Sequence, residues 1–386
     1  MINSTVTFVN AYLNTELQID DVIICVSMSV LIFTRGLISR YIGNKLSPNN
    51  IFQFVFVFFL MFSFTAFLYC SASMTESLFL ARIAHGIATG VFWVSSMTLV
   101  SYLVPLGKKI KGVSSYYFIN NLAAIIIVLV SGILIAKYSP PFAFKISGTI
   151  SIILALLFGI IILRYSHKLK IEKIEKEDKK FKYSFKKLAL EQKIAVTTVI
   201  VSYAINAFIY TYAGIFVIEQ GGTYREVGYL VAFYLTANIL ANYLAPTLHR
   251  RIPPLVLTLS PLIILIGLLC LFSLKHTLAW LFIIIPLITG VYSLSSTVWQ
   301  SITQEYAAQN NQGKIIGFTR GTGDLISFSY YLIMAWIVSH ISPYYGGYIL
   351  AFIIFCNLLF LLYNRKVIKS AFARTSQKGM GDARPL

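Results

Sequence analysis

The chain consists of long apolar runs separated by short polar segments. A helix that crosses a bilayer needs about 20 mostly apolar residues, and eleven runs reach that length. They are Asp21–Ser39, Ile51–Ala72, Leu78–Val104, Gly112–Ala136, Pro141–Leu163, Ile194–Ile218, Val227–Leu248, Leu255–Leu274, Leu278–Ile302, Ile315–Ser339 and Gly347–Tyr363. Met1–Leu13 is apolar but too short to cross alone. The pattern predicts an all-α polytopic membrane protein with eleven full spans.

A charged stretch divides these spans into two groups. Arg164–Lys193 carries eleven basic and five acidic residues. Ile174, Phe181, Phe185 and Leu188 within it are spaced as in an amphipathic helix, which would lie on anionic lipid headgroups. We therefore expect an N-terminal helical bundle over residues 1–163, a linker over 164–193, a C-terminal bundle over 194–363 and a tail over 364–386.

Composition and charge restrict the class of protein and orient it. Charged residues make up 12% of the chain, against about 25% in soluble domains. The net charge of +18 could indicate a nucleic-acid partner, but the basic residues lie in short loops between apolar spans, so we expect none. One set of loops holds 25 of the 32 Lys and Arg and the opposite set holds four. The linker and the C-terminus are therefore expected in the cytoplasm.

The two halves of the chain resemble each other. Residues 89–96 and 289–296 share five of eight positions, and the Ser-Pro pair at 139–140 recurs at 342–343. The same shift aligns Asn121 with Asp324. Repeats in one membrane orientation build one large class of secondary transporters, so we expect two pseudo-symmetric six-helix bundles. The repeat leaves Ile194–Ile218 with an incomplete partner, and Met1–Leu13 is expected to be the outer half of a truncated first helix.

Two motifs carry a resemblance to a known family. Gly36, Gly43 and Lys45 fit the cytoplasmic signature Gly-x-x-x-Asp-Arg-x-Gly-Arg-Arg of the major facilitator superfamily, although Arg40 replaces the Asp of that motif. The segment 82–86, Arg-Ile-Ala-His-Gly, is similar to the family's Arg-x-x-Gln-Gly on the fourth helix. Residues 82–109 look most like bacterial arabinose and other sugar-efflux permeases of the drug/proton antiporter branch, whose Gly-Pro motif on the fifth helix is absent here. The resemblance implies the major facilitator fold, a gating loop at Gly36, Gly43 and Lys45, and a monomer in the bacterial inner membrane.

Ionisable residues inside the spans are the candidates for proton coupling. Asp324 lies ten residues past Lys314, so at about 1.5 Å per residue it sits about 15 Å deep, near the midplane. Ionisable residues at that depth mark transport paths, although a buried pair with Arg320, one turn earlier, could merely orient the helix. Arg82 is a further coupling candidate that can extend toward the outer surface. Arg35 is expected to extend toward the cytoplasm, and His85 is expected to be a packing residue.

The resemblance places the solute cavity between the first, fourth, seventh and tenth helices, with the fifth and eleventh beside them. Aromatic faces combined with hydroxyls and amides suit a sugar or an amphipathic organic molecule. Tyr292, Ser296 and Trp299 fall on one face of the tenth helix. The solute-binding candidates are Trp93, Ser96, Asn121, Asn206, Tyr210, Tyr292, Ser296 and Trp299.

These features favour a secondary active transporter of a small organic solute, with proton-coupled efflux as the leading function. Proton-coupled uptake and a truncated protein that does not transport are the alternatives. An intramembrane enzyme would need paired acids, a Ser/His pair or an HExxH helix, and an ATP-driven pump would need a phosphate-binding loop; the sequence has none of these. Neither a cofactor nor a metal is expected, because the four cysteines lie in apolar runs without metal-ligand spacing.

Overall fold

The computed structural model describes residues 2–47, 50–71, 75–105, 107–165, 188–274, 277–305, 311–370 and Phe372. These residues form helices and no strands. The helices are α1 (Ile2–Thr15), α2 (Asp21–Lys45), α3 (Ile51–Cys70), α4 (Thr75–Leu103), α5 (Lys109–Lys137), α6 (Pro140–Tyr165), α7 (Leu190–Glu219), α8 (Tyr224–Arg251), α9 (Pro254–Leu274), α10 (Leu278–Glu305), α11 (Gln312–His340), the 3-10 turn η3 (Pro343–Tyr345) and α12 (Gly346–Tyr363).

Ten of these helices are long and apolar enough to cross a membrane. They correspond to ten of the eleven predicted runs. The eleventh run forms most of α11, which has 29 residues but includes Lys314, Arg320 and Asp324 and is not among the ten. The 14 residues of α1 are fewer than a full crossing requires. The chain is therefore a multi-pass membrane protein.

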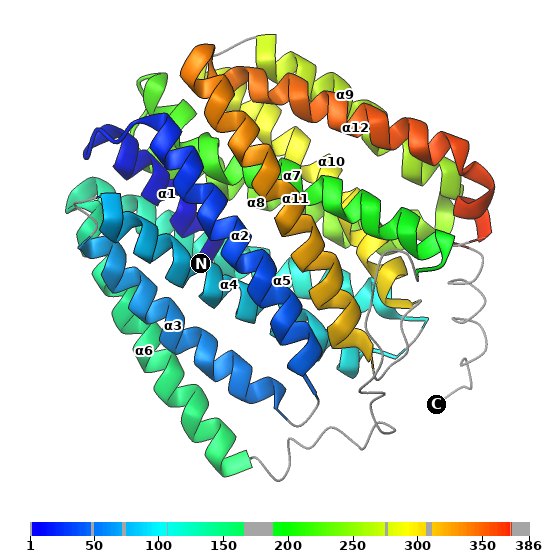
Figure 1. Ribbon diagram of the computed structural model, residues 1–386, viewed down its shortest axis with the longest axis horizontal. Helices are drawn as coiled ribbons and strands as arrows, with labels where there is room; N and C mark the ends of the chain where they lie inside the picture. Colours follow the sequence, from blue (N-terminus) through cyan, green and yellow to red (C-terminus); the bar gives the residue numbers. More distant parts are fainter. Residues whose placement is uncertain are drawn as a thin grey trace.

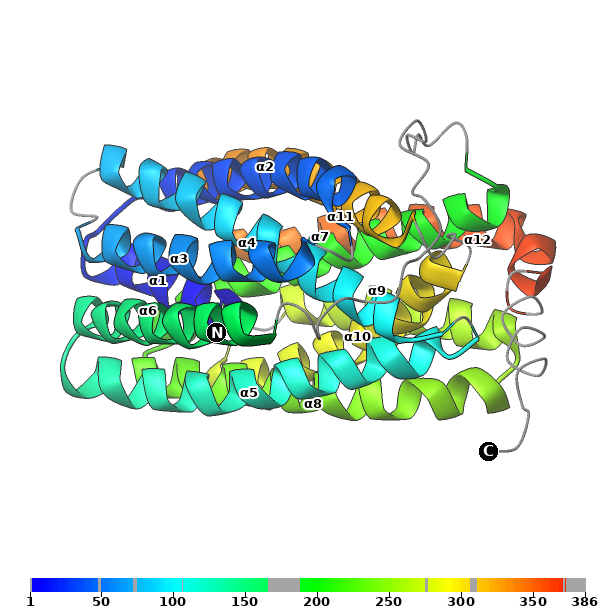
Figure 2. The same cartoon turned by 90° about the horizontal axis from the view of Figure 1, so that it is seen from below.

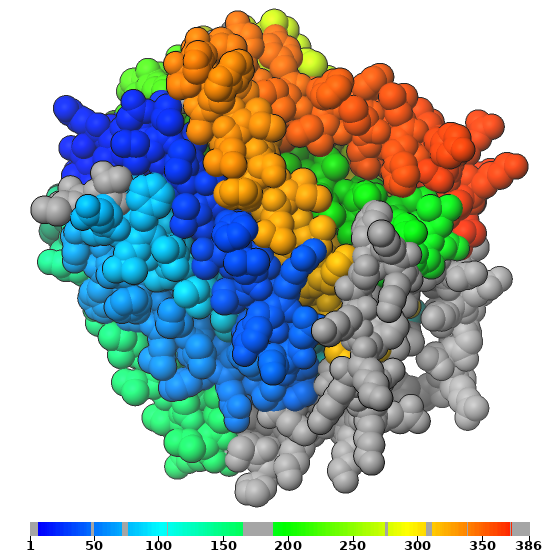
Figure 3. Space-filling model, in the orientation of Figure 1, coloured from blue at the N-terminus to red at the C-terminus, as the bar shows by residue number. Residues whose placement is uncertain are grey.

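The helices pack into one bundle with two seams between the early and the late helices. In Figure 1, α3 and α6 lie on one flank and α9 and α12 on the other. Seen from below, α2 and α11 lie along one face and α5 and α8 along the opposite face (Figure 2). Figure 3 shows the first seam on the surface, with α2 in blue against α11 in orange. The helices α4, α7 and α10 lie between the seams.

Glycines allow the α2–α11 seam to close. A Cβ atom added to Gly43 would lie 2.7 Å from the Cα of Gly317, and one added to Gly36 would lie 3.1 Å from the carbonyl oxygen of Gly321. Small residues permit such close approach of helices in membranes. Gly36, Gly43 and Lys45 were predicted in a gating loop, and that prediction is wrong in one respect: all three lie within α2. Nothing in this segment interrupts the helix, and its glycines pack against α11.

The second seam has looser glycine contacts. A Cβ atom on Gly132 of α5 would lie 3.4 Å from the Cα of Gly228 on α8. The absence of a side chain at both Gly132 and Gly228 therefore allows α5 and α8 to pack closely at this point.

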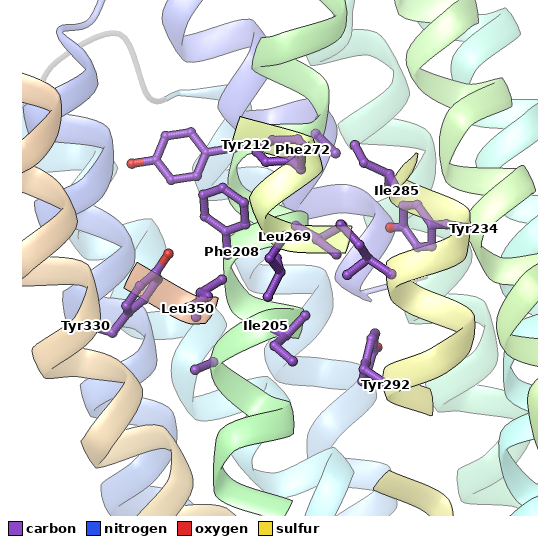
Figure 4. Packing of buried hydrophobic residues seen from close by; sticks show 14 of the residues in the cluster. Ile205, Phe208, Tyr212, Tyr234, Leu269, Phe272, Ile285, Tyr292, Tyr330 and Leu350 are labelled. Carbon is purple, nitrogen blue, oxygen red and sulfur yellow. The ribbon is translucent and has the colours of Figure 1, made fainter. Parts of the chain in front are cut away.

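Apolar side chains fill the space between the late helices. Figure 4 shows Phe208 of α7 and Phe272 of α9 directed toward each other, and their rings meet edge to face at 5.6 Å. Tyr344 stacks on Phe216 at 4.3 Å between ring centroids. Outward-facing residues are also apolar, as on α6, where Leu163 is 81% exposed. An apolar exterior of this extent is typical of a lipid-facing surface.

The predicted linker falls mainly outside the described residues. The structure describes α6 to Tyr165 and resumes at Leu188, so the expected amphipathic helix with Ile174, Phe181 and Phe185 lies in the part that is not described. The helix α7, predicted to begin at Ile194, begins four residues earlier, at Leu190.

Candidate functional site

A buried group of three charged residues joins α2 to α11. Asp324 is fully buried on α11. Arg35 of α2 donates two hydrogen bonds to it, from Nη2 to Oδ1 at 2.7 Å and from Nε to Oδ2 at 2.9 Å. Arg320, one turn before Asp324, donates a third from Nε to Oδ2 at 3.2 Å. The carboxylate of Asp324 is thus shared by two guanidinium groups.

The Arg320–Asp324 pair was predicted, and the participation of Arg35 was not. The expectation that Arg35 extends toward the cytoplasm is wrong, because the side chain is buried and binds Asp324. The close contact at Gly36 explains the difference, since it brings α2 near enough to α11 for the guanidinium of Arg35 to reach the carboxylate of Asp324. The glycines on α2 were the only available signal, and they do not identify which helix packs against them.

Arg82 does not extend toward the outer surface, as its position would have allowed. It is fully buried on α4. Its guanidinium donates to Asn10 Oδ1, to Tyr69 Oη at 3.2 Å and to Ser27 Oγ at 3.3 Å. These oxygens come from α1, α3 and α2. They solvate the buried guanidinium in place of water. His85, one turn later, binds Tyr69 Oη through Nδ1 at 3.0 Å.

Three small adjoining cavities lie at the centre of the bundle, and Arg320 and Tyr203 line all three. Their volumes are about 30, 30 and 50 Å³, enough for a few water molecules. The largest is the polar cavity, which is lined by Trp93, Tyr117, Asn120, Asn121, Tyr203, Asn206, Tyr210, Asn238, Tyr292, Ser293, Ser296, Thr297 and Arg320.

Most of the predicted solute-binding residues share the polar cavity. Those that line it are Trp93, Asn121, Asn206, Tyr210, Tyr292 and Ser296. Of the charged pair, Arg320 lines this cavity together with Asn121, whereas the carboxylate of Asp324 lies behind it against Arg35. Six other lining residues were not predicted, although polar side chains within apolar spans were a signal for them: Tyr117, Asn120, Tyr203, Asn238, Ser293 and Thr297.

Two predicted solute-binding residues lie elsewhere. The placement of Trp299 in the cavity is wrong: its ring packs edge to face on Phe372, with centroids 5.7 Å apart, in the apolar core. Helical periodicity put it on the face of Tyr292, but Gln300 and Thr303 continue the cavity-lining face, and Trp299 lies at its edge, on the side of the apolar core. Ser96 accepts from or donates to Tyr116 Oη at 2.8 Å, one layer behind the cavity wall.

Aromatic rings hold the guanidinium of Arg320. Its central carbon lies 4.3 Å from the ring centroid of Tyr203 and 5.5 Å from that of Trp93. Cation–π contacts of this kind stabilise a charge that is removed from water. The group is therefore fixed at the junction of the three cavities.

Contacts between early and late helices close the central space at both ends. At one end, Thr7 and Asn10 of α1 donate to the carbonyl oxygens of Tyr210 and Thr211 on α7, each at 3.1 Å. At the other, Glu305 of α10 accepts from the backbone N–H of Gly107, at 2.9 Å. A site for a drug-sized ligand occupies about 300–1,000 Å³. Because the central cavities are far smaller, a solute of that size requires one end to open.

The polar cavity can bind a polar organic molecule through amides, hydroxyls and one cation. Within the described ranges, no cluster of His, Cys, Asp and Glu could hold a metal ion. The arrangement therefore offers binding and orientation of a ligand, with charge supplied by Arg320.

Comparisons with known proteins agree on one family. A model described as Major Facilitator Superfamily matches residues 1–331. The proton:xylose symporter XylE bound to 6-bromo-6-deoxy-D-glucose is similar in fold, with a TM-score of 0.65 at 13% identity and 94% of each chain covered.

Two further structures have the same fold at low identity. The outward conformation of the transporter FucP has a TM-score of 0.59 at 14% identity, covering 93% of this chain and 97% of FucP. The human organic anion transporter MFSD10 has a TM-score of 0.62 at 11% identity, covering 92% and 89%. No curated protein matches the sequence.

Proposed function

The chain belongs to the major facilitator superfamily of transporters, and from this premise we propose that it carries a small organic solute by alternating access with proton coupling. The observation that supports this most directly is the polar cavity, which lies between the two seams and is closed at both ends. Solute would enter when the contacts at one end separate and leave when those at the other end do.

The proposed architecture is two pseudo-symmetric bundles, in which α11 makes an eleventh crossing. Exchanging each helix with the one six places later converts the α2–α11 seam into the α8–α5 seam. The glycines of the sequence repeat agree: Gly90 of α4 packs on α2, against Arg35, and Gly290 of α10 packs on α8, against Ala237. We propose a monomer in the bacterial inner membrane.

The proposed orientation puts the linker and the C-terminus in the cytoplasm. It rests on the excess of Lys and Arg in one set of loops. Reporter fusions at Lys179 and Lys378 test it, and the expected result is activity of a cytoplasmic reporter at both positions. Activity of a periplasmic reporter at either position would contradict the orientation.

Asp324 is the proposed coupling residue. A proton on this carboxylate would cancel its charge and leave the guanidiniums of Arg35 and Arg320 without their partner. Because Arg35 is on α2 and Asp324 on α11, protonation would weaken the seam that must move when the bundles rock. Proton binding and conformational change are linked in this way.

Arg82 has a proposed supporting part in the same cycle. It binds Asn10, which in turn binds the carbonyl of Thr211. This chain connects α4 to α1 and α7 at one closed end of the cavity. Arg82 would therefore position the closing contact rather than carry the proton.

We propose efflux as the direction, supported by the resemblance of residues 82–109 to exporters. One observation favours the alternative, proton-coupled uptake. Arg320 both pairs with Asp324 and lines the polar cavity, so a proton on Asp324 would release a donor to the solute. Proton and solute would then favour each other's binding. Such mutual enhancement is typical of symport, in which both cross the membrane in the same direction.

The experiment compares cells that express the wild type, Asp324→Asn or the matched control Asp21→Asn, which removes a carboxylate at the start of α2. Untargeted metabolite profiling of cells and medium identifies the solute that changes. That solute is then followed in proteoliposomes under an imposed proton gradient. We expect the wild type and the control to move the solute in the direction opposite to the protons if the protein is an exporter, and in the same direction as the protons if it is an uptake permease. Asp324→Asn should lose the gradient-driven component of solute transport.

Two results would contradict the proposal. Full gradient-driven transport by a stably folded Asp324→Asn protein would exclude Asp324 as the coupling residue. Wild-type transport that ignores the gradient would exclude proton coupling itself.

A further inference from the structure

The buried charges around the polar cavity do not balance, and we propose that the solute supplies the missing negative charge as a carboxylate or phosphate group on an organic molecule. This inference rests on the proposed function in taking the cavity as the solute site. It adds the substrate class: organic anions, with neutral analogues bound weakly and organic cations excluded.

The imbalance lies in the interior of the described helices. Three guanidiniums, those of Arg35, Arg82 and Arg320, are buried or nearly so, and Asp324 is the one carboxylate at their depth. Arginine stays protonated in proteins, so it cannot discharge by losing a proton. Uncompensated charge in the bilayer core is costly. An anion in the cavity would reduce that cost.

Arg82 does not correct the imbalance, because the acceptors that hold it are neutral. Asn10, Ser27 and Tyr69 provide oxygens without charge. Asp324 neutralises one of the remaining two guanidiniums. Arg35, with two hydrogen bonds at 2.7 and 2.9 Å, is its main partner, and Arg320 contributes one at 3.2 Å.

Arg320 is therefore the cation that is available to a ligand. Its Nε–H faces Asp324, and its guanidinium is held between Trp93 and Tyr203 where the three cavities meet. A planar guanidinium binds carboxylates and phosphates through two parallel hydrogen bonds. Arg35 and His85 line the first of these cavities with it. No acid is found among the described residues that line the three cavities.

Unpartnered polar atoms nearby also point to a ligand. The indole N–H of Trp93 and the side-chain oxygen of Asn238, which is 3% exposed, have no hydrogen-bond partner within the described ranges. Both residues line the polar cavity with Arg320. Buried polar groups normally have partners, so these atoms would bind polar groups of the organic part while Arg320 binds its anionic group.

An adjacent chamber accommodates an apolar substituent. It has a volume of about 190 Å³ and is lined by Phe58, Phe62 and Phe92 together with Trp93 and Asn121. The combination of one cation, several amides and an aromatic chamber fits an organic anion better than an inorganic one.

The first experiment measures binding without any gradient. Purified full-length protein in nanodiscs of zwitterionic lipid, which removes anionic headgroups as ligands, is heated with matched pairs of compounds. The pairs are glucuronate and glucose, salicylate and salicylamide, and phenyl phosphate and phenol. We expect at least one anion to raise the unfolding temperature, as ligand binding to the native state does, and its neutral partner to have a much smaller effect.

Variants of Arg320 and Asp324 test where the anion binds and whether each change weakens or strengthens its binding. Arg320→Gln should weaken binding of the stabilising anion at least about tenfold, because it removes a charge-assisted hydrogen bond. Arg320→Lys should retain part of the binding affinity. Asp324→Asn should strengthen anion binding, because it releases both guanidiniums. A merely structural role of Arg320 predicts no strengthening in Asp324→Asn.

A second experiment needs no knowledge of the solute. With Trp280, Trp299 and Trp336 replaced by Phe, the remaining fluorescence reports on Trp93 beside Arg320. We expect iodide to quench it at least about threefold more effectively than neutral acrylamide, since a positive site concentrates anions. Arg320→Gln should abolish that preference.

The outcomes separate this inference from the proposed function. Absence of anion-selective stabilisation together with equal quenching by iodide and acrylamide would overturn the anion site, as would unchanged anion binding by Arg320→Gln. Gradient-driven transport of a neutral solute would overturn it too and leave the transporter proposal standing. Anion binding through Arg320 without gradient-driven transport would support the site and contradict proton coupling.

Discussion

The shared carboxylate of Asp324 predicts unequal coupling to its two arginines. A hydrogen bond to a charged group contributes about 1.5–3 kcal/mol. Arg35 makes two, at 2.7 and 2.9 Å, and Arg320 makes one, at 3.2 Å. The coupling free energy between Arg35 and Asp324 should therefore reach about 3–6 kcal/mol, against about 1.5–3 kcal/mol for Arg320 and Asp324.

The single substitutions should follow an order set by the charge that each leaves behind. Asp324→Asn leaves two buried guanidiniums unpaired and should destabilise most, by at least about 3–5 kcal/mol. Arg35→Gln leaves Asp324 with the weaker partner and should rank second. Arg320→Gln leaves a balanced, doubly bonded pair and should cost least.

Two double-mutant cycles measure these quantities. Arg35→Gln and Arg320→Gln are each combined with Asp324→Asn, and the free energy of unfolding is obtained by denaturant titration in mixed micelles. A coupling free energy from the Arg320 cycle that equals or exceeds that from the Arg35 cycle would contradict the unequal sharing of the carboxylate. So would Arg320→Gln as the most destabilising of the three substitutions.

Two other predictions use matched positions in the same chain. Gly43→Ala should lower the free energy of unfolding by about 1–3 kcal/mol, because the new Cβ would meet backbone atoms of Gly313 and Gly317 at 2.7 Å. The control Gly267→Ala, with nothing within 4 Å of its new Cβ, should be neutral or stabilise by about 0.5–1 kcal/mol. Equal unfolding temperatures for the two variants would contradict the tight α2–α11 seam. Trp93→Phe should impair solute binding at unchanged stability, since Trp93 lines the polar cavity. Trp299→Phe should lower the unfolding temperature and leave solute binding intact. The reverse pattern, measured by binding and unfolding assays on purified protein, would refute the placement of both residues.

The sequence by itself determined the class of protein and most of its helices. A span of about 20 apolar residues depends only on local composition, so ten of the predicted runs coincide with apolar helices long enough to cross. The pairing of Asp324 with Arg320 followed from helical spacing alone. Several cavity residues could also be predicted from the sequence, because an amide such as Asn121 or Asn206 in an apolar span has few places to face other than a polar interior.

Only the tertiary structure decided which of these groups meet. Arg35 and Asp324 are 289 positions apart, and their contact depends on how closely two glycine-bearing helices approach. Arg82 remained buried because oxygens from three other helices converge on it. Trp299 faces apolar core because it lies at the edge of the cavity-lining face of α10, where Phe372 packs on it. Helical periodicity specifies the face of a side chain but not the neighbour on that face. That neighbour is set by the packing of the whole bundle, in which contacts distant in sequence close together.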